Sequence, residues 1–229
     1  MRDDIIKAAE CVREADALLI GASNGLSIAE GYNIFAGNEM FMKQFGDMHE
    51  RYNIRSVLDG CFFPDAEVRR MFLARLVRLW VDEYRPTEVM DNLYALTEGK
   101  DYFVITSNAD THLELSGFSA ERVFEIEGTF VRELNGSGVD DKSRQAADFI
   151  RRNKDRRMVL LELGIGSRNR MIKQPMMQLA AQLSHATYIT LNLEHELYVP
   201  QTIAHKAIAL AGDIAVTLRE MRKALGTDA

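Results

Sequence analysis

The chain has few of the residues that mark several large classes of protein. Only two cysteines occur among its 229 residues, Cys11 and Cys61, and no CxxC motif is present. This pattern predicts neither a disulfide framework nor a thiolate zinc site, so we expect no bound metal. No apolar run approaches the roughly 20 residues that span a bilayer, and the charged, helix-periodic start MRDDIIKAAECVREAD does not read as a signal peptide. We therefore expect a cytoplasmic protein with no membrane partner.

Basic blocks are absent as well. Lys and Arg number 28 against 34 Asp and Glu, which gives a formal net charge of -6. A nucleic-acid-binding surface needs clustered cations to neutralise phosphates, so the sequence predicts no nucleic-acid partner. The length allows one domain, or one domain with an inserted lobe.

Short apolar runs are present, and they look like buried parallel strands. Polar, helix-forming stretches separate them, a pattern typical of a parallel sheet with helices on both faces. The predicted strands are 17–22, 102–107, 158–166 and 186–193. The predicted helices are 4–15, 25–30, 64–83, 86–98, 111–117, 140–153, 171–184 and 201–225. The fold class expected is α/β, with a Rossmann-like parallel sheet.

The piece from residue 31 to 85 has a different composition. It is rich in Phe, Met and Gly and contains no run of the buried-strand kind. We expect a single domain over 1–229, with a large Rossmann-like part (1–30 and 86–229) and a small helical lobe inserted at 31–85. Its stretches EMFMKQF and DGCFFP suit the core of that lobe, or a lid or acceptor channel. The segment TFVRELNGSGVDD (129–141) is expected to be a loop or a short hairpin.

Small polar residues and glycines follow nearly every predicted strand. The turn GASNGLS (21–27) could hold a phosphate on backbone amides at a helix start, or could simply be a sharp turn. In ITSNADTHLELSGF, Asn108 and Asp110 come directly after a strand, as ligand-binding residues or as helix caps. We interpret His112 as a surface helix residue. Because parallel strands end at one edge, the whole set suits a large nucleotide bound across that edge.

The order of these motifs resembles that of the sirtuins, enzymes that consume NAD. Gly21-Ala22 with Gly25-Leu26-Ser27 is similar to the Gly-Ala-Gly-x-Ser of that family, and TSNAD is similar to its Thr-Gln-Asn-Ile-Asp. Gly117 follows TSNAD at the distance that the sirtuin pattern has. LNLE is similar to the Asn-x-Glu that contacts the ribose in sirtuins, and AGDIAVTL is similar to their closing Gly-Asp turn near the adenine. The resemblance covers residues 5 to 225. In GLSIAEGY, FMKQFGDM, KDYFVITSNAD and LELGIGSRN it is closest to the macrodomain-associated class M sirtuins.

The sequence departs from the sirtuin pattern at several points. Glu127-Gly128 stands where sirtuins have His-Gly, and no four-cysteine zinc module follows it. The Asp-Phe-Arg of the cofactor loop is missing, and Gly166-Ser167-Arg168-Asn169 replaces Gly-Thr-Ser. The first two departures remove the usual base and the zinc lobe, so the resemblance supports NAD binding more strongly than deacetylation.

The resemblance implies a set of site residues. The catalytic residues would be Asn108, Asp110 and Glu127. Asp110 and the backbone at Ala109 would hold the carboxamide, and Asn108 the ribose or a water. Glu127 would face the ribose hydroxyls, and burial would raise its pKa toward that of a general base. The cofactor-binding residues would be Gly21, Ala22, Gly25, Ser27, Ser107, Asn108, Ala109, Asp110, Gly164, Gly166, Ser167, Asn192, Glu194, Gly212 and Asp213.

The function implied is cleavage of the nicotinamide–ribose bond of NAD. The ADP-ribose would pass to a protein acceptor, possible acceptors including a lipoyl-carrier protein, or the enzyme would deacylate a lysine. Two alternatives stay open: a non-catalytic sensor that binds NAD or ADP-ribose, and an NAD glycohydrolase with water as acceptor.

Overall fold

The computed structural model describes residues 2–226, and one parallel sheet of six strands forms their centre. The strand order is β3-β2-β1-β4-β5-β6, that of a doubly wound α/β sheet, and the order reverses between β1 and β4. Both of these central strands are buried along their whole length, which explains their unbroken apolar sequences. The strands are β1 (Ala17–Ala22), β2 (Asp101–Thr106), β3 (Val123–Glu125), β4 (Met158–Leu163), β5 (Ala186–Asn192) and β6 (Ala207–Ala211).

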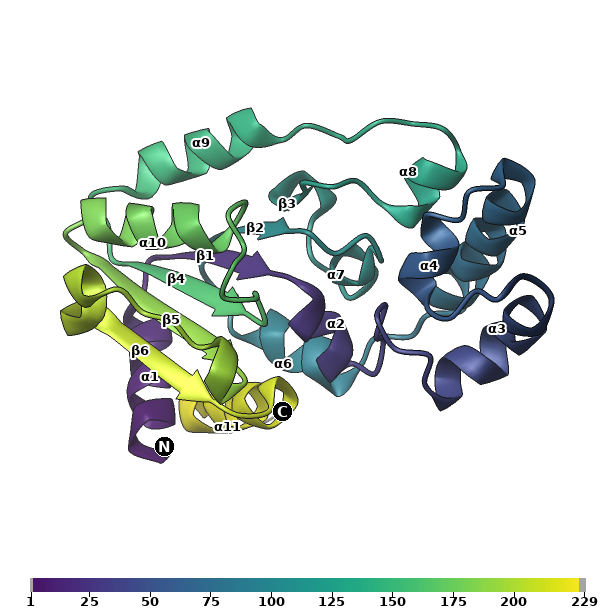
Figure 1. Ribbon diagram of the computed structural model, residues 1–229. Coiled ribbons are helices and arrows are strands. Elements are labelled where there is room, and N and C mark those ends of the chain that lie inside the picture. Colours follow the sequence, from purple (N-terminus) through teal and green to yellow (C-terminus); the bar gives the residue numbers. More distant parts are fainter. Residues whose placement is uncertain (1, 227–229) are drawn as a thin grey trace.

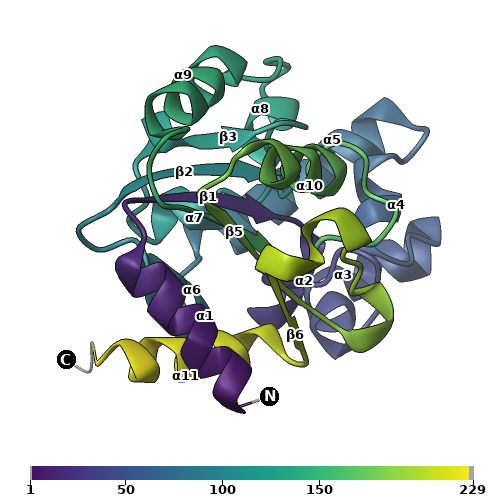
Figure 2. The same ribbon diagram turned by 90° about the vertical axis from the view of Figure 1, so that its left-hand side faces the viewer.

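Helices cover both faces of the sheet (Figures 1 and 2). One face carries α1 (Arg2–Glu14), α6 (Glu88–Ala95) and α11 (Ile214–Leu225), and the other carries α9 (Ser143–Asn153) and α10 (Lys173–Gln182). This arrangement confirms the expected fold class. Within the described part of the chain, no helix is long and apolar enough to cross a membrane.

A third core lies beyond the carboxyl edge of the sheet, at the right of Figure 1. It is built from aromatic and aliphatic side chains that include Phe41, Phe45, Phe72 and Trp80. Its helices are α3 (Glu39–Tyr52), α4 (Val57–Cys61), α5 (Ala66–Val77) and the π-helix η1 (Arg78–Asp82). Short elements connect the rest: α2 (Asn24–Ala29), α7 (His112–Leu115), α8 (Phe130–Leu134), and the 3-10 turns η2 (Ala120–Arg122), η3 (Glu194–Glu196) and η4 (Gln201–Lys206).

The structure differs from the sequence predictions in three segments. Residues 201–225 are not one helix, because η4, β6 and α11 share them. Side chains of residues 207–211 alternate between buried and less buried, as expected for an edge strand. The alanine-rich sequence also fits a helical periodicity, so the strand could not be recognised from the sequence. The three-residue strand β3 was not predicted. Residues 129–141 form no hairpin: α8 begins there, and Phe130 packs against the third core.

Candidate active site at the carboxyl edge of the sheet

A cavity of about 620 Å³ lies between the carboxyl ends of the strands and the third core. Its size is in the range of ligand pockets. The sheet side supplies the polar wall, which includes Ser27, Ser107, Asn108, Asp110 and Glu127. The opposite wall is apolar and includes Ile34, Phe35, Val57, Leu58, Leu73 and Phe130.

Asn108 has an unpartnered atom at this cavity. Its side chain is buried and donates from Nδ2 to the carbonyl oxygen of Ser23 at 3.2 Å, while its backbone N–H donates to Thr106 Oγ1 at 3.0 Å. Asn108 Oδ1 is also buried, yet it has no hydrogen-bond partner among the described residues. Because an orphaned buried acceptor is costly, this atom is ready to accept a hydrogen bond from a ligand or a water.

Asp110 is held from two sides. Its Oδ2 accepts a hydrogen bond from Ser27 Oγ at 2.5 Å, and its Oδ1 accepts from the backbone N–H of His112 at 3.1 Å. The carboxyl group is therefore fixed at the wall of the cavity. The hydroxyl of Ser27, a predicted cofactor-binding residue, orients Asp110 in this structure.

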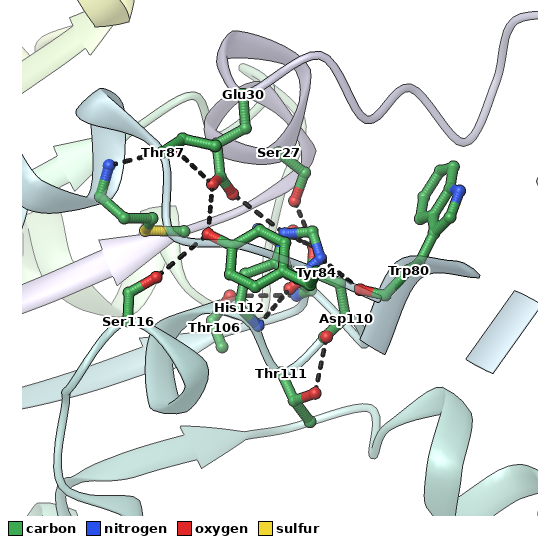
Figure 3. A network of polar contacts seen from close by, with 12 residues as sticks. Ser27, Glu30, Trp80, Tyr84, Thr87, Thr106, Asp110, Thr111, His112 and Ser116 are labelled. Carbon is green, nitrogen blue, oxygen red and sulfur yellow. Dashed lines mark hydrogen bonds and ion pairs between the residues drawn. The ribbon is translucent and has the colours of Figure 1, made fainter. Parts of the chain in front are cut away.

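His112 is not a surface residue, contrary to the prediction, but is fully buried beside Asp110 (Figure 3). Its Nδ1 lies 3.1 Å from Glu30 Oε2, and its Nε2 lies 2.8 Å from the carbonyl oxygen of Trp80. Burial acts to lower the pKa of His112, but Glu30 and Asp110 together raise it above its usual value. No local sequence signal announces this residue, because its partners come from distant segments.

Glu125 and Glu127 differ in burial. Glu127 lines the mouth of the cavity and is exposed, so the burial expected for it is absent. Glu125, the last residue of β3, is half-buried, and its Oε1 has no partner among residues 2–226. Burial, with the nearby Glu114 carboxylate, raises the pKa of Glu125 to about 8. The sequence analysis did not identify Glu125, because the short strand β3 that it ends was not predicted.

Three of the predicted cofactor glycines have a packing role. A Cβ at Gly25 would collide with the Gly164 backbone, and a Cβ at Gly164 would collide with Gly25 in the same way. The Gly25 N–H donates to the Gly164 carbonyl oxygen at 3.1 Å. A Cβ at Gly21 would overlap the Met176 side chain, and Ala22 is fully buried. The glycine-rich turn thus brings β1, β4 and their loops into contact.

The remaining predicted residues lie at or after the ends of β4, β5 and β6 and do not line the cavity. Asp213 caps α11 by accepting from the Val216 N–H, and Asn192 Nδ2 donates to the Ile165 carbonyl oxygen at 2.9 Å. The Ser167 N–H donates to Glu196 Oε2 at 2.6 Å, which lowers the pKa of Glu196. The residues of this second group are Gly166, Ser167, Asn192, Glu194, Gly212 and Asp213. The cavity brings together Ser27, Ser107, Asn108, Ala109, Asp110 and Glu127.

A buried ion pair supports the loop after β4. Lys173 Nζ donates to Glu162 Oε1 at 2.6 Å, and both side chains are fully buried. Tyr188 donates to the other oxygen of Glu162, and Thr190 donates to Oε1 at 3.1 Å. The pair connects β4, β5 and the start of α10, and so fixes both ends of the loop between Leu163 and Lys173.

The protein is similar to one curated relative and to several solved structures, while no family model matches the chain. A protein ADP-ribosyltransferase of Staphylococcus aureus is 23% identical over 95% of this chain and 88% of the relative. A solved Sir2 homolog–NAD complex has a TM-score of 0.62 at 17% identity, covering 96% of this chain and 94% of the other. A Sir2 enzyme bound to a propionylated peptide has a TM-score of 0.62 at 14% identity, covering 97% and 98%.

A third solved structure, from work on the mechanism and regulation of Sir2 enzymes, has a TM-score of 0.61 at 16% identity. It covers 99% of this chain and 98% of the other. These Sir2 structures thus match the arrangement of this chain along nearly its whole length. The chain has the fold of the Sir2 enzymes, the sirtuins.

Proposed function

We propose that this chain is an NAD-dependent enzyme of sirtuin type that transfers ADP-ribose from NAD to a protein side chain. The observation that carries the proposal is the cavity wall where unpartnered Asn108 Oδ1 lies near the buried, oriented Asp110. The names of the relatives support it, since one is an ADP-ribosyltransferase and another is an NAD complex.

The residues of the cavity fit the nicotinamide ribose end of NAD. Asn108 Oδ1 can accept a hydrogen bond from a ribose hydroxyl or an ordered water, and Asp110 can accept one from the carboxamide N–H₂. NAD supplies an ADP-ribosyl group whose bond to nicotinamide is weakened by the positive charge of the ring. The apolar wall, which includes the buried Val57 and Leu73, limits the contact of the ribose with bulk water.

Each polar residue then has a defined task. Asp110, oriented by Ser27, holds the carboxamide so that nicotinamide leaves with the electrons of its bond to the ribose. Asn108 fixes the ribose, and the Glu127 carboxylate at the mouth stabilises positive charge on the sugar and receives the proton of the incoming nucleophile. The second group (Gly166, Ser167, Asn192, Glu194, Gly212 and Asp213) would hold the far ribose and the adenine, with Gly21, Ala22, Gly25 and Gly164 shaping that end.

The acceptor that we propose is a side chain of another protein, and the resemblance favours a lipoyl-carrier protein. The exposed Glu127 supports entry of such an acceptor from the cavity mouth, where the exposed Phe62 also lies. Lysine deacylation is the related activity that the same bond cleavage would serve.

Release of nicotinamide from labelled NAD tests the proposal. We expect release that depends on lysate from the source cells, with label transferred to a protein. Asn108→Ala should abolish release, because it removes Oδ1, the unpartnered acceptor that we propose binds the ribose. Glu127→Ala should lower release about 100-fold, in the range of a lost general base.

The matched control is Asn135→Ala, at an exposed residue that ends α8. It should keep full activity. Release without lysate would instead indicate a glycohydrolase. A raised melting temperature with NAD but no release would indicate a binding protein, and full release by Asn108→Ala would contradict the site.

A further inference from the structure

His112 lies between two hydrogen-bond acceptors, one at each ring nitrogen (Figure 3). The carbonyl oxygen of Trp80 can only accept, so Nε2 must carry a proton. Nδ1 faces the carboxylate of Glu30, and it also lies 3.9 Å from Asp110 Oδ2. Two carboxylates beside one fully buried ring favour a proton on Nδ1 as well.

The Glu30 carboxylate is itself held as an acceptor. Its Oε1 accepts hydrogen bonds from Tyr84 Oη at 2.8 Å and from Thr87 Oγ1 at 2.7 Å. Oε2 is left for His112, and the side chain of Glu30 is fully buried. Both donors to Oε1 are hydroxyl groups, so the positive charge facing this carboxylate comes from the ring.

Aromatic rings enclose the remaining faces of His112. Tyr84 stacks on it with ring centroids 3.8 Å apart, and Tyr32 meets it edge-on at 4.5 Å. The groups that face the ring are thus Glu30 from the C-cap of α2, Asp110 from the loop after β2, Tyr32 and Tyr84. The ring is fully buried, so water screens its charge only weakly from the carboxylates of Glu30 and Asp110.

We infer that His112 is a positioning residue of the site, held as a buried cation that compensates the charge of Asp110 and fixes that carboxylate toward the cavity. It acts through Asp110, which accepts a hydrogen bond from the His112 backbone N–H and lies beside Nδ1 of the ring. It also connects the site to the third core, because the Trp80 ring packs there and donates to Gln44 Oε1 at 2.9 Å. The inference rests on the proposed function for the role of Asp110.

The first test measures the ionisation of the ring. In ¹⁵N spectra of the histidine rings, assigned by loss of one signal in His112→Gln, we expect His112 to lose its second ring proton at a pH above the ordinary histidine value of about 6.5. A singly protonated His112 ring at pH 7 would overturn the inference.

The second test follows nicotinamide release against pH. We expect an alkaline limb that coincides with loss of the second ring proton of His112. Glu30→Gln removes the nearest carboxylate, so it should move both the limb and the ring titration downward by about one pH unit or more. Glu50→Gln, at an exposed position of α3, should move neither.

The outcomes separate the inference from the proposed function. A limb that stays in place in Glu30→Gln while the ring titration moves would overturn the positioning role of His112 and leave the enzyme assignment intact. Absence of release from the unaltered protein at every pH, with or without lysate, would overturn the enzyme assignment. In that case the ring spectra still decide whether His112 is a buried cation.

Discussion

At the residue scale, Gly25 and Gly164 show why two loops of the site lack side chains. Their backbones touch, and Gly164 also has a φ of +60°. No side chain fits between them, since a Cβ on either would lie inside the other backbone. The contact fixes the distance between the ends of β1 and β4, where the strand order reverses.

Gly25→Ala is therefore expected to destabilise the fold by about 3 kcal/mol, because a rigid backbone cannot move aside for the added methyl group. Urea unfolding measures the loss. Gly138→Ala is the control, since a Cβ there meets nothing within 4 Å. Equal unfolding midpoints for the two variants would show that the loops can separate without cost.

Glu125 makes stability depend on pH. The folded state keeps its proton up to a pKa of about 8, whereas the unfolded chain releases it near 4.5. The folded state thus binds more protons between these values, so the contribution of Glu125 to stability falls as pH rises through that window. His112 acts in the same direction, because its raised pKa gives a contribution that is lost as pH rises through the folded value.

Glu125→Gln should accordingly raise the free energy of unfolding at pH 9 by about 2 kcal/mol or more, and change it little at pH 4. Denaturant titrations at the two pH values provide the comparison, with the exposed Glu121→Gln as control. An equal effect of Glu125→Gln at both pH values would refute the assigned titration.

At the element scale, the ion pair of Glu162 and Lys173 joins a strand to a helix beneath the loop of residues 164–172. Both charges are fully buried, and hydroxyl groups of Tyr188 and Thr190 complete the shell of Glu162. Such a pair adds little net stability, but losing one partner leaves the other charge uncompensated.

Lys173→Met should cost about 4 kcal/mol, because Glu162 stays buried without its cation. Adding Glu162→Gln to Lys173→Met should restore part of the loss, since the remaining group is neutral. Thermal and urea unfolding measure both variants beside the exposed Lys154→Met. A double variant as unstable as the single one would mean that packing of the lysine stem, and not charge, sets the cost.

Long apolar strands could be read from the sequence, and short edge strands could not. β1 has the predicted bounds, and β2, β4 and β5 differ from the predicted ranges by a few residues at the ends. β3 pairs with β2 over three residues, too few to produce a period. β6 is alanine-rich and lies between two helical segments, so its pairing with β5 decides its conformation.

At the scale of the whole molecule, the site was predictable in part. Asn108 and Asp110 follow a buried strand, and the rule that strand ends meet at one edge brings them together. His112 was not predictable, because its burial depends on Trp80 and Glu30, which are 32 and 82 residues away in the sequence. The division of the chain into 31–85 and a larger part stays a prediction, and Phe130 and Leu134 pack against the third core from outside it.

The position of β1 in the middle of the sheet has a consequence for how the chain folds. Ala17 pairs with Asp101 on one side and with Met158 on the other, so the first strand made finds its partners only late in synthesis. Until then, ALLIGA emerges as an unpaired apolar segment. Contacts this distant make folding slow and favour aggregation of the unfinished chain. Most of the chain must therefore be synthesised before β1 can pair with both β2 and β4. The helical part between β1 and β2 is free to fold before that pairing.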